Sequence, residues 1–482
     1  MAARLSSLLQ RDLDADPEIT GVTADSRKVR PGSLFVALPG SRTDGRSFIA
    51  AALDAGAAAV LAPDDVEGLP VPALHASDLR RAYALAARAF YGRQPKTCVA
   101  VTGTNGKTSV AVFCRQIFER LGKSSASMGT LGVQAGAEQL TPPGLTTPDA
   151  ADVARLMADL AERGVTHLAL EASSHGVDQR RLDGVALTAA GFTNLTQDHL
   201  DYHGTMGAYR AAKLRLFETL LPRGGAAVLN ADSDAYDAFS AAAVTSGQSV
   251  LSVGEAGHGL RLVDRRPVPG GQQLTLDVYG RRYEIRLPLA GAFQASNALV
   301  AAGLCIAAGE TAEAVLAALE HIEGAPGRLQ RVGSGPRGGE AYVDYAHTPD
   351  GLETVLKALR PHARGRLIVV FGAGGDRDRG KRPLMGQAAA ALADLAIVTD
   401  DNPRSEDPAS IRAAILAAAP GAREIGDRRA AIGAACALLQ DGDVLVVAGK
   451  GHERGQIVGA AVHPFDDVAE TAAALGMEAA HG

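Results

Sequence analysis

VAVTGTNGKTSVAVF, residues 99–113, joins an apolar run to a helical pattern through a glycine-rich turn. A standard phosphate loop reads G-x-x-x-x-G-K-[ST], but Val101 stands where its first glycine belongs, and the nearest glycine is Gly103. The apolar run predicts a strand, and the following helix begins at about Thr108. A strand, a glycine turn and a helix are the setting in which backbone N–H groups and the helix dipole bind phosphate. We interpret GTNGKT as a shortened phosphate loop; a tight turn with incidental glycines is the alternative.

This loop supplies the first candidate ATP-binding residues. Lys107 would reach the β- and γ-phosphates, and the Thr108 hydroxyl would bind Mg²⁺. Since consecutive backbone N–H groups form such a cradle, the whole stretch is included: Gly103, Thr104, Asn105, Gly106, Lys107, Thr108 and Ser109. Arginine dominates the basic residues of this chain. Among the few lysines, Lys107, Lys381 and Lys450 fall inside glycine-rich motifs.

Bulk composition narrows the class of protein. The 482 residues are 46% hydrophobic and 21% charged, which is ordinary for globular domains, and about 150 residues per domain suggests roughly three of them. A net charge of −6 argues against a nucleic-acid-binding protein. No run approaches the ~18 apolar residues of a membrane span. Scattered cysteines and a start without a long apolar core predict a cytoplasmic protein with small-molecule partners, and we expect a monomer.

The chain divides into three predicted domains. Residues 1–96 hold short strand-like pieces, an alanine-rich helix near FIAAALDAGAAAVLA and a second helix, LRRAYALAARAFYG, before Gln94-Pro95. In residues 97–327 strands alternate with helices, which predicts a parallel sheet covered by helices. Residues 328–482 repeat that rhythm. The predicted class is α/β throughout.

Candidate metal ligands stand where predicted strands end. Glu171 closes THLALE, and His199 follows another strand in FTNLTQDHLDYHG. Carboxyl ends of parallel strands line one crevice, so both side chains could face the phosphate loop. The alternatives are a helix cap for Glu171 and a hydrogen-bonded loop histidine for His199. Lys213, on a predicted amphipathic helix, has nothing in its spacing to distinguish it from a solvated lysine.

A set of motifs resembles the Mur ligase family, and within it the members that add the third amino acid of the peptidoglycan stem. They run from about Thr23 to Glu453 in the expected order: GTNGKT, EASSHGVDQRR, FTNLTQDHLDYHG with AYRAAKLRLF, DYAHTPD, GGDRDRGKRPLM, DDNPR and AGKGHE. The resemblance implies a small N-terminal α/β domain for the uridine nucleotide, a central P-loop ATPase-type domain and a C-terminal Rossmann-like domain for the amino acid. It also implies that G-T-N-G-K-T is the family's normal ATP loop.

The resemblance further implies site residues by motif. Lys213 matches a lysine carried as an N6-carbamate (N6-carboxylysine), which with Thr108, Glu171 and His199 would bind Mg²⁺; Lys107, Glu171, His199 and Lys213 form the catalytic set. The remaining ATP candidates are Asn297, Arg328, Asp344 and His347. The candidates for the UDP-muramoyl dipeptide are Ala24, Ser26, Ser41, Arg42, Thr43, Thr146, Thr147, Ser173, Gln179 and Arg181, the segment 41–43 being the looser match.

The C-terminal motifs bear on the incoming amino acid. The resemblance assigns it to Arg377, Asp401, Asn402, Pro403, Arg404, Gly449 and Glu453. meso-Diaminopimelate carries a distal carboxylate that L-lysine lacks, and the Arg404 guanidinium can bind such a group in a two-pronged fork. An Asx-Pro turn with a surface arginine is the alternative for DNPR.

The implied reaction is ATP-dependent, ADP-forming ligation of meso-diaminopimelate to the D-glutamate γ-carboxylate of UDP-N-acetylmuramoyl-L-alanyl-D-glutamate through an acyl phosphate. ATP is the co-substrate and Mg²⁺ the cofactor. The alternatives are an L-lysine-adding ligase of the same family, a folylpolyglutamate synthase, a P-loop ATPase switch, and a nucleotide-sugar-binding scaffold with an inactive ATP site. ADSR and DNPR disfavour the folate enzyme, and the intact loop and acidic ligands disfavour the scaffold.

Overall fold

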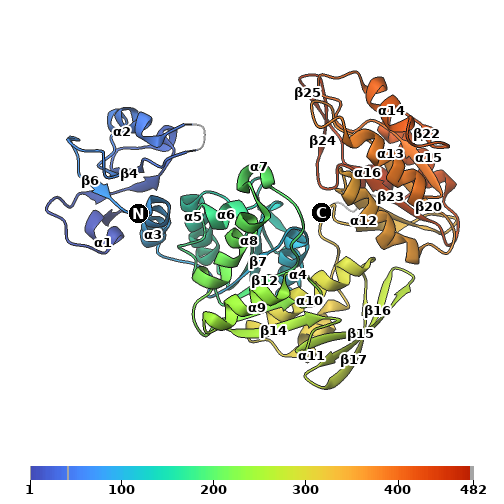
Figure 1. Cartoon of the computed structure of the whole chain (residues 1–482), viewed down its shortest axis with the longest axis horizontal. Helices are drawn as coiled ribbons and strands as arrows, with labels where there is room; N and C mark the ends of the chain where they lie inside the picture. The colour runs from blue at the N-terminus through green and yellow to red at the C-terminus, as the bar shows by residue number, and fades with distance from the viewer. Residues whose placement is uncertain (1, 41–42, 478–482) are drawn as a thin grey trace. The chain divides into compact units, whose positions relative to one another are not determined.

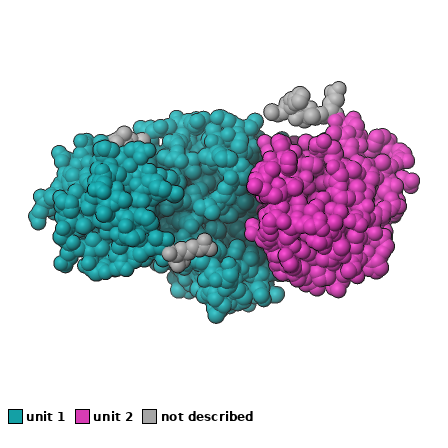
Figure 2. All heavy atoms as spheres, turned by 90° about the horizontal axis from the view of Figure 1, so that it is seen from above, with its two compact units in different colours: residues 1–258, 300–311 teal, residues 259–299, 312–482 magenta. Residues whose placement is uncertain are grey.

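The computed structural model describes residues 2–40 and 43–477. They form two compact units, residues 1–258 with 300–311 and residues 259–299 with 312–482, coloured separately in Figure 2. The described residues include no helix long and apolar enough to cross a membrane.

The N-terminal part of the first unit is a small parallel sheet of order β3-β4-β5-β6. Its strands are β3 (Gly21–Thr23), β4 (Ser33–Val36), β5 (Ala59–Ala62) and β6 (Ala73–His75), and its helices are α1 (Leu5–Leu9), α2 (Ile49–Asp54) and α3 (Leu79–Tyr91). A short pair, β1 (Ala3–Arg4) and β2 (Glu18–Ile19), lies beside them in sequence. The alanine-rich run predicted as a helix is helical only to Asp54. Its second half is β5, because burial between two neighbouring strands overrides the helical preference of alanine.

The rest of the first unit is the predicted parallel sheet (Figure 1). Its order is β10-β9-β8-β11-β7-β12-β13-β14, parallel except for β9 and β10. The strands are β7 (Thr97–Thr102), β8 (Ser125–Gly129), β9 (Gly132–Ala135), β10 (Glu138–Thr141), β11 (His167–Glu171), β12 (Ala189–Phe192), β13 (Ala226–Asn230) and β14 (Ser249–Gly254). The helices are α4 (Lys107–Arg120), α5 (Ala150–Glu162), α6 (Ser174–Asp178), α7 (Leu200–His203), α8 (Met206–Arg215) and α9 (Tyr236–Thr245), and α10 (Ala292–Ala307) ends here.

The second unit contains a meander and a second parallel sheet. The antiparallel meander of β15 (Leu260–Val268), β16 (Gly271–Val278) and β17 (Arg281–Leu287) departs from the predicted strand–helix rhythm. The second sheet has the order β18-β19-β23-β20-β21-β22, with β18 antiparallel. Its strands are β18 (Gln330–Ser334), β19 (Glu340–Asp344), β20 (Leu367–Phe371), β21 (Leu395–Val398), β22 (Arg423–Glu424) and β23 (Val444–Ala448).

Helices cover both faces of this second sheet. Val369 and Phe371 of β20 pack on one face and Ile368 and Val370 on the other, as the two-residue strand period requires. The helices are α12 (Pro349–Leu359), α13 (Lys381–Leu392), α14 (Pro408–Leu416), α15 (Arg428–Leu438) and α16 (Asp467–Ala474). Helix α11 (Ala312–Leu319) contacts β17 of the meander instead. A hairpin, β24 (Gly455–Val458) with β25 (Ala461–Pro464), follows β23.

Candidate active site

The glycine loop occupies the turn between β7 and α4, as predicted. Gly103 passes so close to β12 that a Cβ there would lie 1.9 Å from Thr193 Oγ1, so only glycine fits. The segment after β12 fixes the loop: the Thr104 N–H donates to the Asn194 carbonyl at 2.9 Å and the Asn105 N–H to Asn194 Oδ1 at 3.0 Å. The loop backbone is therefore held at the carboxyl ends of β7 and β12, next to the start of a helix.

Two lysine amines converge on this loop. Lys107 Nζ donates to the carbonyls of Gly103 at 2.9 Å and Thr104 at 2.8 Å, and Lys213 Nζ donates to the same Gly103 oxygen at 2.7 Å. Lys213 is only 1% exposed, with its ammonium 4.4 Å from the Tyr209 ring centroid. Burial, and secondarily the Lys107 charge, lower the pKa of Lys213 to about 6. The alternative of a solvated lysine is wrong.

Glu171 lies against the loop as well. Thr108 Oγ1 donates to Glu171 Oε2 at 3.0 Å, and the Thr130 N–H donates to Oε1 at 2.8 Å. The helix-cap alternative is wrong, since Ser173 caps α6. A hydroxyl and a buried carboxylate are hard oxygen donors that suit Mg²⁺. No three His, Cys, Asp or Glu side chains of the described ranges gather into a set that could bind a metal by themselves.

His199 belongs to a cluster of aromatic rings. It is exposed, starts α7 with a φ of 52° and lies 3.4 Å from Asp198. Its ring is 4.8 Å from that of His175 and 6.1 Å from that of Tyr209, the ring that also contacts Lys213. His199 and Lys213 thus share a neighbour, although the loop-histidine alternative for His199 stays open.

The central candidates for the muramoyl dipeptide form one hydrogen-bonded network beside Glu171. Thr147 Oγ1 donates to the Glu171 carbonyl at 2.9 Å and lies 3.0 Å from Ser173 Oγ. Arg181 donates to the Thr147 carbonyl at 2.5 Å and to Gln179 Oε1 at 2.7 Å. Thr146 joins through Thr130, 2.9 Å away. Burial lowers the pKa of Arg181.

The N-terminal candidates lie on loops of the small sheet. Ala24 and Ser26 follow β3, where Asp25 caps the turn at Ser26, and Thr43 is exposed. Ser41 and Arg42 lie outside the described residues.

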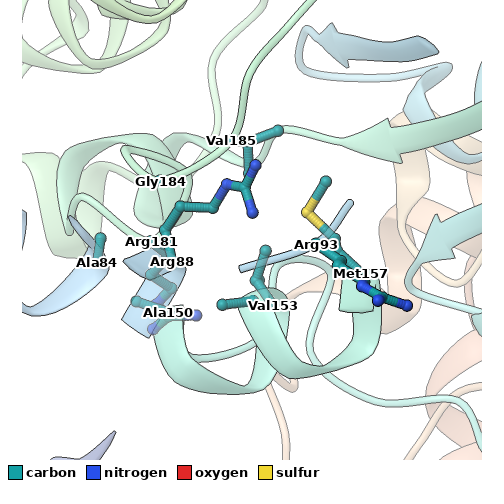
Figure 3. Close-up of a pocket in the computed structure, with 10 residues that line it drawn as sticks. Ala84, Arg88, Arg93, Ala150, Val153, Met157, Arg181, Gly184 and Val185 are labelled. Carbon is teal, nitrogen blue, oxygen red and sulfur yellow. The ribbon is translucent and has the colours of Figure 1, made fainter. Parts of the chain in front are cut away.

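Arg181 also lines a cavity of about 10 Å³ with Met157 (Figure 3). A space of this size holds at most one water molecule, so it is not a substrate pocket.

In the second unit the candidates for the adenosine end of ATP are adjacent. Asn297 Nδ2 donates to Gln294 Oε1 at 3.2 Å, and Gln294 Nε2 donates to the Arg328 carbonyl at 2.8 Å. The Arg328 guanidinium lies 4.7 Å from the Tyr345 ring centroid, and the exposed His347 ring is 4.6 Å from that of Tyr345. These polar and aromatic groups could bind a nucleoside.

The Asp344 side chain forms hydrogen bonds with nearby backbone groups. Its carboxylate accepts the N–H groups of Leu329 at 2.6 Å and Ala346 at 2.8 Å. Burial raises the pKa of Asp344 to about 6 although Arg328 and these two bonds oppose the rise. Asp344 therefore orders the segments that carry Arg328 and His347.

The candidates for the amino acid also gather at one place of the second unit, the carboxyl ends of β21 and β23. Asp401, Asn402 and Pro403 are buried, and Asn402 Nδ2 donates to Glu453 Oε2 at 3.0 Å. A Cβ on Gly449 would lie 2.5 Å from Asp401 Oδ2, so glycine lets that carboxylate approach.

The two arginines of this set flank residues 374–376. Arg404 has a φ of 53° and donates to the Gly375 carbonyl at 2.8 Å. Arg377 is exposed, and it and Arg404 both lie beside Gly374. Arg404 is half-buried, so it is not a fully solvated arginine, and the alternative of an Asx-Pro turn stays open.

Sequence reasoning missed several residues of these sites. Thr130 anchors Glu171, Tyr209 packs on Lys213, and Tyr345 lies between Arg328 and His347. Lys450 drew notice only as a lysine in a glycine-rich motif, yet it is fully buried beside Asn402. Proximity to a recognised motif was the available signal for Tyr345, and nothing local distinguished Thr130.

Comparison with known proteins agrees with these motifs. Three Mur ligase family models match: the "Mur ligase family, catalytic domain" at residues 18–91, the "Mur ligase middle domain" at 101–305 and the "Mur ligase, glutamate ligase domain" at 327–451. UDP-N-acetylmuramoyl-L-alanyl-D-glutamate--2,6-diaminopimelate ligase of Caulobacter vibrioides is 72% identical over 486 residues, covering 99% of this chain and 100% of that relative. The enzyme of the same name from Bradyrhizobium diazoefficiens is 55% identical over the same coverage.

Solved structures give the same result. A structure of a UDP-N-acetylmuramoyl-L-alanyl-D-glutamate--2,6-diaminopimelate ligase matches with a TM-score of 0.77 at 35% identity, covering 99% of both chains. Folylpolyglutamate synthase of Mycobacterium tuberculosis matches with a TM-score of 0.62 at 20% identity, over 83% of this chain and 96% of that one, a likeness of fold alone. By its family models, its relatives and its three-domain α/β fold, the chain belongs to the Mur ligase family.

Proposed function

We propose that this protein is the ATP-dependent, ADP-forming ligase that joins meso-diaminopimelate to the D-glutamate γ-carboxylate of UDP-N-acetylmuramoyl-L-alanyl-D-glutamate in peptidoglycan precursor synthesis. The carrying observation is a phosphate loop with Thr108 Oγ1 3.0 Å from the buried Glu171 carboxylate. The 72% identity to a ligase of that name supports the same activity. A bare ATPase switch would leave the Asp401–Asn402–Glu453 set unexplained.

The chemistry follows from the poor reactivity of a free carboxylate toward an amine. A γ-carboxylate oxygen of D-glutamate attacks the γ-phosphorus of ATP, ADP leaves, and an acyl phosphate forms. The amine of diaminopimelate then attacks the acyl carbon to give a tetrahedral intermediate, which expels phosphate and loses a proton to leave the amide. Lys107 binds the transferring phosphoryl group, and the loop N–H groups hold the phosphates, so catalysis is mainly positioning and electrostatics.

Lys213 is proposed to act as an N6-carbamate. Its amine is neutral at pH 7 because its pKa is about 6. A neutral amine can attack CO₂, forming the N–C bond and releasing one proton. The product is a buried carboxylate on a side chain that would otherwise be a cation.

Mg²⁺ is the proposed cofactor, bound by Thr108, Glu171, His199 and carbamylated Lys213. The hydroxyl and carboxylate oxygens fit its preference for hard donors. When bound, it would neutralise charge on the phosphates. Thr130 positions Glu171 through the 2.8 Å bond from its N–H.

The remaining residues are assigned to the substrates part by part. Residues 1–96, with Ala24, Ser26 and Thr43, bind the uridine nucleotide, and the Thr147–Ser173–Arg181 network binds the dipeptide beside the phosphate loop. Residues 97–327 bind ATP, and Asn297 of this part lies at the adenosine end. Arg328 and His347, which follow this part in the sequence, are assigned to the same end of ATP. Residues 328–482 bind the amino acid.

A cytoplasmic monomer is proposed, in keeping with four unpaired, buried cysteines.

The identity of the amino acid rests on Arg404. Its guanidinium can bind the distal carboxylate of diaminopimelate through two parallel hydrogen bonds, while the Asp401 carboxylate accepts from the distal amine and Asn402 holds Glu453 beside it. L-Lysine would leave the guanidinium without that partner, which is costly for a half-buried charge. The L-lysine-adding ligase is therefore the second candidate.

Phosphate release by the purified protein tests the proposal, with ATP, Mg²⁺ and the UDP-muramoyl dipeptide present and either amino acid added. Turnover with meso-diaminopimelate alone is the expected result. Equal or better turnover with L-lysine would keep the ligase and overturn the role of Arg404. Release that ignores both amino acids would favour the ATPase.

A further inference from the structure

Lys450 is a buried lysine with no role in the function proposed above. It follows β23, and its side chain is 0% exposed. Its ammonium donates to Asn402 Oδ1 at 2.7 Å and to the Gly455 carbonyl at 2.8 Å, and lies 3.8 Å from Asp401 Oδ1. A buried ammonium is retained only where oxygen acceptors replace its water, and here one of those acceptors is a candidate substrate-binding side chain.

The Lys450 bond fixes which way the Asn402 amide points. Asn402 Oδ1 accepts a second hydrogen bond, from the Ile457 N–H at 2.9 Å, and Nδ2 donates to Glu453 Oε2 at 3.0 Å. Turning the amide over would set its NH₂ against two donors and its oxygen against a carboxylate. The surroundings therefore permit one orientation.

The same contacts order the backbone around the amino-acid candidates. Gln456 Nε2 donates to the Asp401 carbonyl at 2.8 Å, and the Arg404 N–H donates to the Ile457 carbonyl at 3.0 Å. The Gly455 carbonyl, which Lys450 binds, starts this hairpin. Lys450 thus connects residues 401–404 to β24 through its buried hydrogen bonds to Asn402 and Gly455.

Charge balance fits a structural cation at this point. Burial lowers the pKa of Lys450, as does the nearby Arg428, while Asp401, Glu453 and Asp467 raise it. Arg428 is itself committed to Asp467 through bonds of 2.8 Å and 2.6 Å. Lys450 is therefore the cation in direct contact with Asn402.

We infer that Lys450 is a positioning residue for amino-acid recognition: it orients the Asn402 side chain, and through it Glu453, toward the incoming diamino acid. This inference rests on the proposed function and deepens it. Lys450 acts through Asn402 and does not itself touch the substrate. The effect of losing it should fall on the amino acid and spare the other two substrates.

Lys450→Met tests this, because methionine is similarly long and unbranched but donates no hydrogen bond. The expected result is a KM for meso-diaminopimelate raised about tenfold or more, with the KM values for ATP and the UDP-muramoyl dipeptide within about twofold of wild type. Lys357→Met is the matched control, since that side chain is 61% exposed on α12, and all three constants should stay unchanged. A Lys450→Met enzyme with an unchanged KM for diaminopimelate overturns the inference.

A double mutant separates positioning from a merely structural effect. If Lys450 acts through Asn402, Lys450→Met in an Asn402→Ala background adds almost nothing to the KM for diaminopimelate, whereas independent effects would multiply. Multiplying effects would reject the route through Asn402.

A second variant covers the case in which Lys450→Met does not fold. Asn402→Asp still accepts from Lys450 and Ile457 but cannot donate to Glu453, so it should raise the KM for diaminopimelate selectively. An unchanged KM there counts against the inference. The wild-type enzyme, assayed alongside, separates failure of the proposed function from failure of the inference. If wild type shows no diaminopimelate-dependent turnover, both the proposed function and the inference are overturned. If wild type is active and the variants are unaffected, the inference alone is overturned.

Discussion

Lys107 and Lys213 donate to one and the same oxygen, the carbonyl of Gly103, at 2.9 Å and 2.7 Å. Two ammonium groups this close repel each other, and the buried Lys213 yields, with its pKa lowered to about 6 chiefly by burial. Lys107 is the less buried of the two and is proposed to bind phosphate, whereas Lys213 is proposed to react as a neutral amine. One loop carbonyl thus contacts two lysines that differ in burial.

Replacing Lys213 by alanine should reduce kcat about 100-fold or more, because the buried anion expected from its carbamate is lost. Small carboxylic acids such as acetate should restore part of the rate by occupying the vacated space. Phosphate release measures both effects. Lys123→Ala, which removes an amine paired with Glu310 on the surface, should leave the rate unchanged. Near-normal turnover of Lys213→Ala would rule out the carbamate.

Glu171→Gln should raise the Mg²⁺ concentration for half-maximal activity about tenfold, because an amide is a poorer ligand for a hard cation than a carboxylate. The amide oxygen can still accept from the Thr130 N–H, and the Thr108 hydroxyl can turn to accept from the amide NH₂, so the fold should survive. Chelation with EDTA should stop phosphate release by wild type, and added Mg²⁺ should restore it. Glu218→Gln, at an exposed position, is the control. A Mg²⁺ dependence identical to wild type would remove Glu171 from the ligand set.

The strand, the loop and the helix around GTNGKT could be predicted because their signals are local. β7 ends at Thr102 and α4 begins at Lys107, within one residue or so of the expectation. The same holds for β11 and β12, which set Glu171 and Thr193 beside the loop. Such elements follow from hydrophobic periodicity and turn residues.

Lys213 shows what local signals cannot give. Its helix pattern predicts solvent exposure, whereas its burial depends on the Gly103 carbonyl, 110 residues earlier in the chain. Only resemblance to a family singled it out. The burial of Lys450 also depends on distant parts of the chain. Lys450 follows β23 and Asn402 follows β21, and the two residues meet because β21 and β23 both pair with β20. The β15–β17 meander was not predicted although buried and exposed residues alternate along β16 and β17, because the strand–helix rhythm expected for residues 97–327 was extended over it.

Arg404→Ala should raise the KM for meso-diaminopimelate about tenfold or more and should narrow the preference over L-lysine. Arg404→Lys should recover only part of the affinity, since an ammonium cannot form the fork. Steady-state kinetics with each amino acid provide the measurement. Arg364→Ala serves as the control because that side chain is 72% exposed. If the Arg404→Ala enzyme keeps the wild-type KM, the distal carboxylate is bound elsewhere.

The Asp344 carboxyl should make the second unit less stable as the pH rises from about 4 to about 6. Its pKa is raised to about 6 in the folded protein, against roughly 3.9 in an unfolded chain. Between these values the folded state holds more protons than the unfolded state, so deprotonation costs stability, on the order of 3 kcal/mol when complete.

Asp344→Asn removes this titration while keeping one oxygen acceptor for the Leu329 or Ala346 N–H. The variant should be less stable than wild type at pH 4, because one of those N–H groups then faces an NH₂ group. The difference in Tm between wild type and Asp344→Asn should shrink by about 5 °C as the pH rises from about 4 to about 6. Thermal unfolding of both proteins at matched pH values measures the difference. Asp350→Asn, which changes a first-turn residue of α12, controls for the loss of a carboxylate. A Tm difference that stays constant with pH would mean that Asp344 titrates like an ordinary exposed carboxyl.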